Sequence, residues 1–355
     1  MGRGKKAITI RDVARTAGVS VSTVSRVLND KDDVAPETHE KVQIVIRRLG
    51  YTSSLAARSM RSRRTNVIGL IMPDVEYPFA IEVMKGVNRA ITQHGYEFIV
   101  YTGGEIRNES TAERERRYIS LLNSSITDGI ILVTPATTHF STASPVVVVD
   151  PNSEGPPCPA VIATNRAAAL NVIEYLIGLG HRRIGFVTGR LGLESAVRRL
   201  EGYKDGLRQA GIAQDPDLIQ IGDYTEEVGY ACAQRLVSLA NRPTAIFAAN
   251  DQSALGVYRA VEEAGLEIPK DISVVGFDNI PEAAHARPGL TTVDQFIDQM
   301  GRVAAEQLID LIQGKAQESE TRKMPTQLVV RDSCRALAAG AAEAQPSAAP
   351  RKAAK

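Results

Sequence analysis

The sequence predicts an all-α helix-turn-helix domain followed by a larger α/β domain of two doubly wound, parallel-sheet subdomains. Three observations lead to this fold class. Residues 9–50 contain three short helical patterns, short apolar runs alternate with helical patterns from residue 67 onward, and a length of 355 residues suits two to three domains. Because 43% of the residues are hydrophobic, the chain can bury a substantial core.

The stretch from Thr9 to Asn29 predicts two short helices separated by a glycine turn. In the first helix, apolar residues recur at the spacing of one helix face: Ile10, Val13, Ala14 and Ala17. Gly18 can adopt a positive φ in the turn, and the Ser20 hydroxyl can cap the second helix by accepting a free backbone N–H. The second helix points three residues inward, Val24, Val27 and Leu28. It leaves four residues outside, Val21, Ser22, Ser25 and Arg26.

Two helices joined in this way form a helix-turn-helix, whose second helix can lie in the major groove of DNA. The alternative is an ordinary corner between two helices, because such short patterns also arise by chance. Pro36 predicts the start of a third helix that ends at Gly50. The residues expected to face inward are Val42, Val45, Ile46 and Leu49. Residues 53–64 form a short arginine-rich helical pattern, too short to be stable alone, and the alternative is a simple linker.

Strand and helix patterns then alternate along the chain. The predicted strands are 67–72, 97–101, 129–133, 146–149, 161–162, 184–187, 218–221, 245–248, 273–275 and 327–330. The predicted helices are 80–93, 111–123, 166–179, 194–210, 226–240, 253–264 and 296–313. This alternation favours parallel sheets with helices on both faces, and so many units over about 270 residues indicate two sheets. We expect a flexible basic arm at 1–7 and a disordered tail rich in Ala and Pro at 336–355.

The charge is distributed unevenly. Residues 1–64 contain 14 Lys and Arg against 6 Asp and Glu, whereas the remaining residues contain 28 against 35. A basic small module joined to a mildly acidic larger one is typical of a nucleic-acid binder with a separate partner domain. Three widely spaced cysteines and five scattered histidines predict neither a disulfide framework nor a metal site. No secretory signal or membrane span is recognisable, so we expect a cytoplasmic protein without a membrane partner.

Polar side chains follow several predicted strands at the point where each ends. They are Asp74, Asp150, Asn250, Asp251, Asp278 and Gln295. The carboxyl ends of parallel strands meet at one cleft, which Arg199 on a helix could join. Such groups suit a neutral polyhydroxy ligand, and Tyr224 and Phe79 offer flat faces to a sugar ring or a planar base. The alternative for any single polar residue is a helix cap, to which Asn250 and Asp251 are especially open.

No catalytic motif accompanies this cleft. The sequence has no G-x-S-x-G, no G-x-x-x-x-G-K-[ST], no G-x-G-x-x-G after a strand and no H-E-x-x-H. Asp150 and Asp278 could be imagined as an acid/base pair, but two ligand-binding carboxylates explain them equally well. We therefore expect a protein that is not an enzyme and that uses no catalytic residue and no cofactor.

Several motifs in a fixed order point to a family. They are TIRDVARTAGVSVSTVSRVLN, EKVQIVIRRLGY, LAARSM, ALNVIEYLIGLGHRRIGFVTG, RLEGYKDGL, AIFAANDQSALGVYRAVEEAGLEIPKDISVVGFDN and LTTVDQ. From about Ile8 to Arg335 the chain resembles the LacI/GalR family of bacterial transcription regulators. The resemblance implies a DNA-binding domain at 8–53, a hinge helix at 54–65 and a periplasmic-binding-protein-like domain at 66–335. The last comprises an N-subdomain (about 66–163 plus 296–324) and a C-subdomain (about 164–295 plus 325–335).

The resemblance also implies a homodimer that binds a pseudo-palindromic operator in double-stranded DNA. The positions that match base-reading residues are Val21, Ser22 and Arg26, and the candidates for phosphate contacts are Thr9, Ser20, Thr23 and Asn29. The LAARSM segment matches a hinge helix that wedges an apolar residue into the minor groove. Its implied contact residues are Ala57, Met60 and Arg61, and Met60 replaces the usual Leu.

A small ligand in the cleft is implied to control operator affinity. The matching positions are Asp74, Phe79, Asp150, Arg199, Tyr224, Asn250, Asp278 and Gln295. Tyr77-Pro78-Phe79-Ala80 replaces the common N-P-F-F, and Val197 stands where many members carry a second Arg. Asp150 and Tyr224 favour a sugar over a purine. The alternatives are a nucleobase-type corepressor and a sugar-binding protein without DNA function. Members that respond to an inducer and members that respond to a corepressor share this layout.

Overall fold

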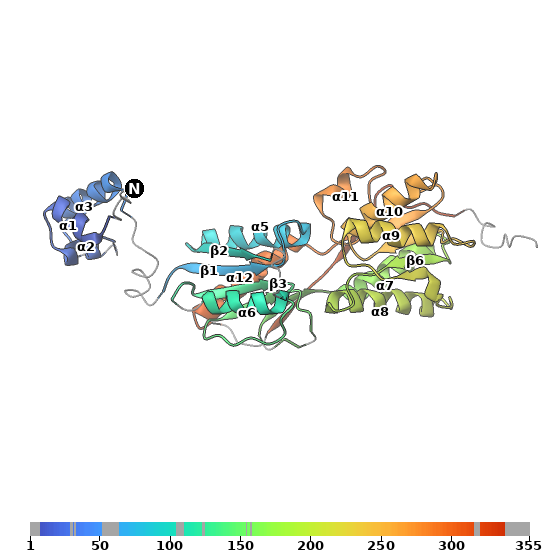
Figure 1. The fold of residues 1–355 in the computed structure, drawn as a ribbon, viewed down its shortest axis with the longest axis horizontal. Coiled ribbons are helices and arrows are strands. Elements are labelled where there is room, and N and C mark those ends of the chain that lie inside the picture. Colours follow the sequence, from blue (N-terminus) through green and yellow to red (C-terminus); the bar gives the residue numbers. More distant parts are fainter. Residues whose placement is uncertain are drawn as a thin grey trace, which may run out of the picture. The chain divides into compact units, whose positions relative to one another are not determined.

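The computed structural model describes residues 8–28, 31, 33–51, 64–103, 110–122, 125–153, 155–156, 158–315 and 320–337. The chain divides into two compact units, Met1–Thr65 and Asn66–Lys355. The first is helical and the second contains parallel sheets covered by helices (Figure 1), which confirms the predicted fold class. The arm at 1–7, Asn29, the hinge residues Ala57, Met60 and Arg61, and the tail from residue 338 lie outside the described residues.

The helical unit consists of the three predicted helices, α1 (Ile10–Ala17), α2 (Val21–Leu28) and α3 (Pro36–Leu49). Gly18 and Gly50 follow α1 and α3 with φ of 66° and 63°, a left-handed conformation that glycine adopts at little cost. The buried core comes from all three helices and consists of Val13, Ala14, Ala17, Val24, Val27 and Val42. The helical periodicity of the sequence therefore located this core.

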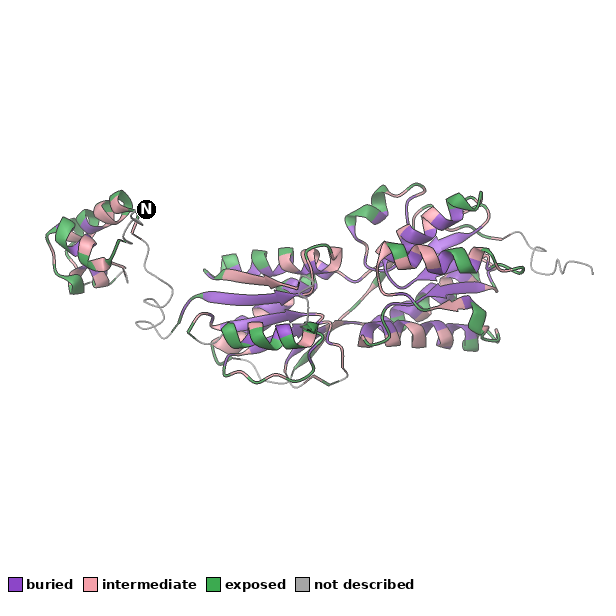
Figure 2. Cartoon of the chain, viewed as in Figure 1, coloured by how far each residue is buried: buried purple, intermediate pink, exposed green. Residues whose placement is uncertain are grey.

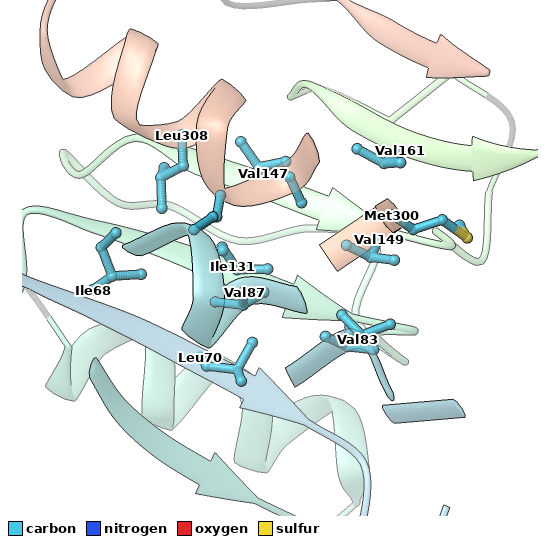
Figure 3. Close-up of a cluster of buried hydrophobic side chains, with 14 of the residues drawn as sticks. Ile68, Leu70, Val83, Val87, Ile131, Val147, Val149, Val161, Met300 and Leu308 are labelled. Carbon is cyan, nitrogen blue, oxygen red and sulfur yellow. The ribbon is translucent and has the colours of Figure 1, made fainter. Parts of the chain in front are cut away.

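The N-subdomain is built on a six-stranded parallel sheet in the order β11-β5-β4-β3-β1-β2. Its strands are β1 (Val67–Met72), β2 (Glu97–Thr102), β3 (Gly129–Val133), β4 (Val146–Val149), β5 (Ala160–Ala163) and β11 (Thr321–Met324). One face packs against α5 (Pro78–Gln93) and α12 (Ile297–Ile312), and the other against α6 (Thr111–Leu121). Figure 3 shows strand residues such as Leu70 and Val147 in one cluster with Val83 of α5 and Leu308 of α12.

Helices α5 and α12 approach each other closely because both carry glycine at the contact. A Cβ added at Gly86 would lie 1.8 Å from the carbonyl oxygen of Asp298, and one added at Gly301 would lie 2.1 Å from that of Val83. Real Cβ atoms do not approach backbone oxygens so closely. Any side chain at either position would therefore push the two helices apart.

The C-subdomain contains a four-stranded parallel sheet in the order β7-β6-β8-β9. Its strands are β6 (Ile184–Val187), β7 (Ile219–Gln220), β8 (Ala245–Ala248) and β9 (Ser273–Val275). One face is covered by α7 (Asn165–Gly178) and α8 (Glu194–Gln209), the other by α9 (Glu226–Val237) and α10 (Asp251–Glu263). Buried residues are concentrated on the strands and on the inner faces of these helices (Figure 2).

Four elements were not predicted as the structure has them. Two short helical segments lie where the sequence predicts a strand or a loop. They are the 3₁₀ turn Pro216–Leu218, which precedes β7, and α11 (Pro281–His285). β10 (Thr292–Asp294) pairs in an antiparallel ladder with β12 (Gln327–Val329), although only parallel pairing was expected. β11 was missed because its sequence, TRKM, is polar and lies at a sheet edge, where side chains face water.

The chain passes between the two sheets three times, at 163–165, 294–297 and 324–327. The first and third connections are tied together, because the Thr164 amide donates to the Met324 carbonyl at 3.1 Å. The Thr164 and Thr326 hydroxyls are also 3.1 Å apart. Within the described ranges, no helix has the length and hydrophobicity needed to cross a membrane.

Candidate functional site

The outer face of α2 presents the residues predicted to read DNA. Val21 is 41% exposed, and Ser22 and Arg26 are also exposed, while Val24 and Val27 are buried. An exposed apolar side chain contributes little to the stability of the domain. It is therefore available to contact a partner such as a thymine methyl. Arg26 lies 3.4 Å from Asp33, with both side chains more than half exposed. Such an exposed ion pair is weak and leaves the guanidinium able to exchange partners.

The start of α2 gathers the hydroxyls predicted to contact phosphate. Ser20 Oγ accepts from the Thr23 amide at 3.0 Å, which confirms the predicted cap. The same oxygen lies 2.6 Å from Ser22 Oγ and 2.8 Å from Thr23 Oγ1. Thr9 begins α1 with a capping box, in which its amide and hydroxyl both donate to Asp12. Hydroxyl donors at a helix N-terminus favour an anion such as a phosphate.

A cavity lies between the two subdomains, and we call it the cleft cavity. Its lining residues are Pro73, Tyr77, Phe79, Ala80, Thr134, Asp150, Arg190, Leu193, Ser195, Arg199, Tyr224, Asn250 and Asp278. They come from the loops after strands of both sheets and from the first turns of α5 and α8. In the described part of the chain, no group of three or more His, Cys, Asp or Glu side chains could hold a metal ion.

Four residues of this lining are held in left-handed backbone conformations. Thr134, Asp150, Tyr224 and Asp278 have φ of 42°, 51°, 78° and 118°. Such values are unfavourable for residues with a side chain, and they persist where surrounding structure enforces them at ligand sites. Their concentration around one cavity marks it as a functional site independently of its residue types.

Arg199 is the central charged group of the cleft cavity. It is 4% exposed, and its guanidinium stacks 3.6 Å from the centre of the Phe277 ring. Nη1 donates to the Ala249 carbonyl at 2.5 Å and lies 3.6 Å from Asp278 Oδ1, and Nε donates to Asn165 Oδ1 at 2.9 Å. These contacts fix the side chain in one orientation, ready to meet a ligand oxygen.

Two contacts bridge the cleft cavity from one subdomain to the other. Ser195 Oγ of α8 donates to Asp150 Oδ2, which follows β4, at 3.1 Å. The Arg190 guanidinium lies 5.9 Å from the centre of the Tyr77 ring, within the range of a cation–π contact. Both contacts join the N-subdomain to the C-subdomain, so each must adjust when the cleft opens.

The structure brings together six of the eight residues predicted for the ligand. Phe79, Asp150, Arg199, Tyr224, Asn250 and Asp278 line the cleft cavity. Asp74 does not, because its carboxylate accepts from the Glu76 amide in a local turn. Gln295 lies behind the lining, where Nε2 donates to Asp278 Oδ1 at 2.6 Å.

Asn250 is the helix cap that the alternative predicts, whereas Asp251 is a buried structural residue that does not cap a helix. Asn250 Oδ1 caps α10 by accepting from the Ser253 amide, and its Nδ2 donates to the Tyr224 carbonyl. The fully buried Asp251 accepts from the Thr292 hydroxyl and the Ile280 amide. Asn250 therefore lines the cavity while both ends of its side-chain amide are engaged within the protein.

Ser195 and Arg190 line the cleft cavity and were missed from the sequence. Both follow β6, where Arg190 lies in the loop and Ser195 in the first turn of α8. Neither residue directly follows its strand, and neither residue type is specific for a ligand site, so nothing in the local sequence distinguishes Arg190 and Ser195 from their neighbours. The rule that loops after parallel strands form the site would have included them.

Asp278 is expected to make stability depend on pH. Burial raises its pKa to about 7, against the pull of the nearby Arg199 guanidinium. The folded protein thus holds this proton more tightly than the unfolded chain, whose carboxyl titrates near pH 4. Stability from this group is complete below about pH 4 and decreases as the pH rises to about 7.

Between pH 5 and pH 8 wild type should therefore lose about 2 kcal/mol relative to Asp278→Asn, which carries no titrating group there. Chemical denaturation of both proteins across this range measures the difference. An equal pH dependence in the two proteins would contradict the raised pKa.

A helix-turn-helix unit joined to a two-lobed α/β unit with a polar cleft defines a ligand-responsive DNA-binding regulator. Residues 9–54 match the family model for bacterial regulatory proteins of the lacI family, and residues 173–334 match that for a periplasmic binding protein-like domain. The HTH-type transcriptional repressor CytR of Escherichia coli (strain K12) is 33% identical over 93% of this chain and 97% of its own length. The chain belongs to the LacI family and is a transcriptional regulator, not an enzyme.

Solved structures agree with this assignment. The lac repressor dimer bound to operator and the anti-inducer ONPF matches with a TM-score of 0.83 and 28% identity, over 93% of this chain and all of that one. A complex of the transcriptional regulator CelR with cellobiose matches with a TM-score of 0.68 and 32% identity, over 92% of this chain and 99% of that one. Both similarities extend through the helical unit and the α/β unit.

Proposed function

We propose that this regulator is a homodimeric repressor whose affinity for a pseudo-palindromic operator is controlled by a sugar bound in the cleft cavity. The observation that carries the sugar assignment is the combination of charged and aromatic side chains that line the cavity. The Asp150 and Asp278 carboxylates can accept from ligand hydroxyls, Arg199 can donate to their oxygens, and Phe79 and Tyr224 offer faces for sugar C–H groups. The cellobiose bound by the CelR relative supports the same ligand class.

Binding requires the two subdomains to move. The cleft cavity has a volume of about 50 Å³, which is room for one or two water molecules and not for a sugar ring. A sugar therefore enters by separating the walls, which breaks the Ser195–Asp150 and Arg190–Tyr77 contacts and replaces them with contacts to the ligand. The affinity difference between the open and closed states determines how far the ligand shifts the equilibrium.

On the DNA side, Val21, Ser22 and Arg26 would read base edges, while Thr9, Ser20, Thr23 and Asn29 would contact phosphates. Ala57, Met60 and Arg61 would form the hinge contact in the minor groove, with Met60 as the wedge. Ligand-dependent movement of the paired N-subdomains would change the spacing of the two hinges and so the operator affinity. The lac repressor dimer on its operator supports this arrangement.

A thermal-shift screen of the purified protein against sugars and purine bases tests the ligand class. A ligand that binds only the folded state raises the melting temperature, and we expect this from sugars alone. A shift produced by purines and not by sugars would instead favour a nucleobase corepressor, which could stack on Phe79 and Tyr224. The same compounds are then added to a gel-shift assay with DNA from the regulator's own promoter.

Substitution of Val21 and Ser22 should change which operator is bound. Both side chains are exposed on α2, and each contact of this kind discriminates between bases by roughly tenfold. Selection from randomised DNA with wild type and with Val21→Gln/Ser22→Ala measures the preference. Ile44→Ala, an exposed position on α3, serves as the control and should select the wild-type site. An unchanged preference in the double variant would remove these residues from the base-reading set.

A further inference from the structure

Asn165 occupies a position between the cleft cavity and the connections that join the subdomains. It is the first residue of α7, at the end of the first connection, and it is 7% exposed. It does not line the cleft cavity, and no sequence motif singles it out. Its side-chain amide nevertheless reaches both the central arginine of the site and the backbone of the connection.

The two ends of this amide have different partners. Oδ1 accepts from Arg199 Nε at 2.9 Å, and Nδ2 donates to the Ala163 carbonyl at 3.3 Å. The orientation of the amide follows from chemistry, because the guanidinium can only donate and the carbonyl can only accept. One planar group therefore joins the Arg199 side chain to the last residue of β5.

The backbone that Asn165 contacts through Nδ2 is part of the first connection and is hydrogen-bonded to the third. Ala163 is paired in register with Met324 of β11, and the Thr164 amide donates to the Met324 carbonyl. The Thr164 and Thr326 hydroxyls lie 3.1 Å apart at the same place. A displacement of Asn165 thus acts on the first and third connections together, and these are two of the three segments through which the chain passes between the subdomains.

The other side of the link is the ligand-facing charge pair. Arg199 Nη1 lies 3.6 Å from Asp278 Oδ1, and both side chains are at least nine-tenths buried. Any change at Asp278 alters the electrostatic pull on the guanidinium. Since Nε of the same planar group is bound to Asn165, the change reaches Asn165 without an intervening flexible side chain.

We propose that Asn165 is a positioning residue that holds Arg199 in its orientation and transmits changes in the cleft cavity to the interdomain connections. This inference rests on the proposed function, in which the cavity binds the effector. It assigns to one residue the step from effector site to subdomain movement. The residue need not touch the ligand, because it acts through Arg199.

Hydrogen exchange in the full-length protein tests the link without any ligand. The probe is Asp278→Asn at pH 8, where the Asp278 carboxylate is ionised, so that the substitution removes the charge that Arg199 faces. The readout is the exchange rate of the Thr164 amide, which donates across the two connections. In the wild-type background we expect Asp278→Asn to accelerate this exchange about fivefold or more, the lower end of typical coupling between sites.

Asn165→Asp keeps one of the two hydrogen bonds of this side chain and removes the other. Its carboxylate still accepts from Arg199 Nε, but it cannot donate to the Ala163 carbonyl. In this background the effect of Asp278→Asn should shrink to within about twofold. Asn165→Ala removes both bonds without adding charge and should give the same loss of coupling, which covers the case in which the aspartate variant does not fold.

Asn241→Asp is the matched control, because it makes the same substitution at an exposed position outside the cavity. It should leave the full effect of Asp278→Asn in place. Equal acceleration in the Asn165 and wild-type backgrounds would overturn the proposal, and so would no acceleration in the wild-type background. Because no ligand is used, either result is distinct from a failure to find a sugar effector.

Discussion

Arg199→Ala will abolish the response of operator binding to the effector. Among the residues that the structure describes, Arg199 carries the one cation that both lines the cleft cavity and lies against Asp278, and three fixed partners hold it in place. Loss of a buried, charged hydrogen-bonding group should weaken effector binding by about 100-fold or more. Gel-shift titrations of operator DNA with and without the sugar found in the thermal-shift screen measure the response.

The same substitution will also lower stability, because it leaves Asp278 buried without its cation. Asp278, whose pKa is already raised to about 7, can then take up a proton, so the cost is that of the hydrogen-bond partners left unmatched, about 1–3 kcal/mol. Binding must therefore be measured at a temperature where the variant is still folded. Arg198→Ala is the matched control: Arg198 is the preceding residue of α8 and pairs with Glu194 and Glu201. It should retain the response. If folded Arg199→Ala lost operator binding together with the effector response, Arg199 would not be a specific ligand residue.

Gly86→Ala will destabilise the N-subdomain more than any surface substitution. The added Cβ would meet the Asp298 carbonyl oxygen at 1.8 Å, and that oxygen belongs to the backbone of α12 and cannot rotate away. We expect a loss of about 3 kcal/mol in the free energy of unfolding, at the upper end of the range for overpacked sites. Denaturant unfolding followed by circular dichroism measures it.

Gly178→Ala provides the control for this substitution. Gly178 also lies in a helix, α7, but a Cβ there meets nothing within 4 Å. The variant should match wild type or gain up to about 1 kcal/mol, because alanine restricts the unfolded chain. If the two glycine variants were equally stable, α5 and α12 would not be packed as closely as the structure has them.

Most of the fold could be predicted because hydrophobic periodicity determines it. The six apolar residues of β1 are all buried, and a run of this kind is expected only where both faces of a strand are covered. The periodicity gave no such signal for β11, whose edge position lets Thr321 and Lys323 stay exposed while Arg322 and Met324 are half-buried. The pairing of β10 with β12 was equally invisible, because it joins segments more than 30 residues apart.

The candidate site could be predicted only in part, because residue type and position along a strand do not fix the direction of a side chain. Asp150 and Asp278 reach the cleft cavity as expected from strand ends. Asp74 occupies an equivalent position but turns back to the Glu76 amide. Asn165 stayed hidden because its role depends on Arg199, which lies 34 residues further along the chain.

The left-handed residues around the cleft cavity limit how this protein can acquire a new ligand. The positive φ values at Thr134, Asp150, Tyr224 and Asp278 are tolerated best by glycine, asparagine and aspartate. A β-branched replacement at one of these positions would strain the backbone in addition to changing the contact with the ligand. Phe79, Leu193 and Ser195 carry no such restriction. Engineering of effector specificity, like its natural divergence, should therefore succeed first at these three positions, with the strained ones retained as a fixed frame.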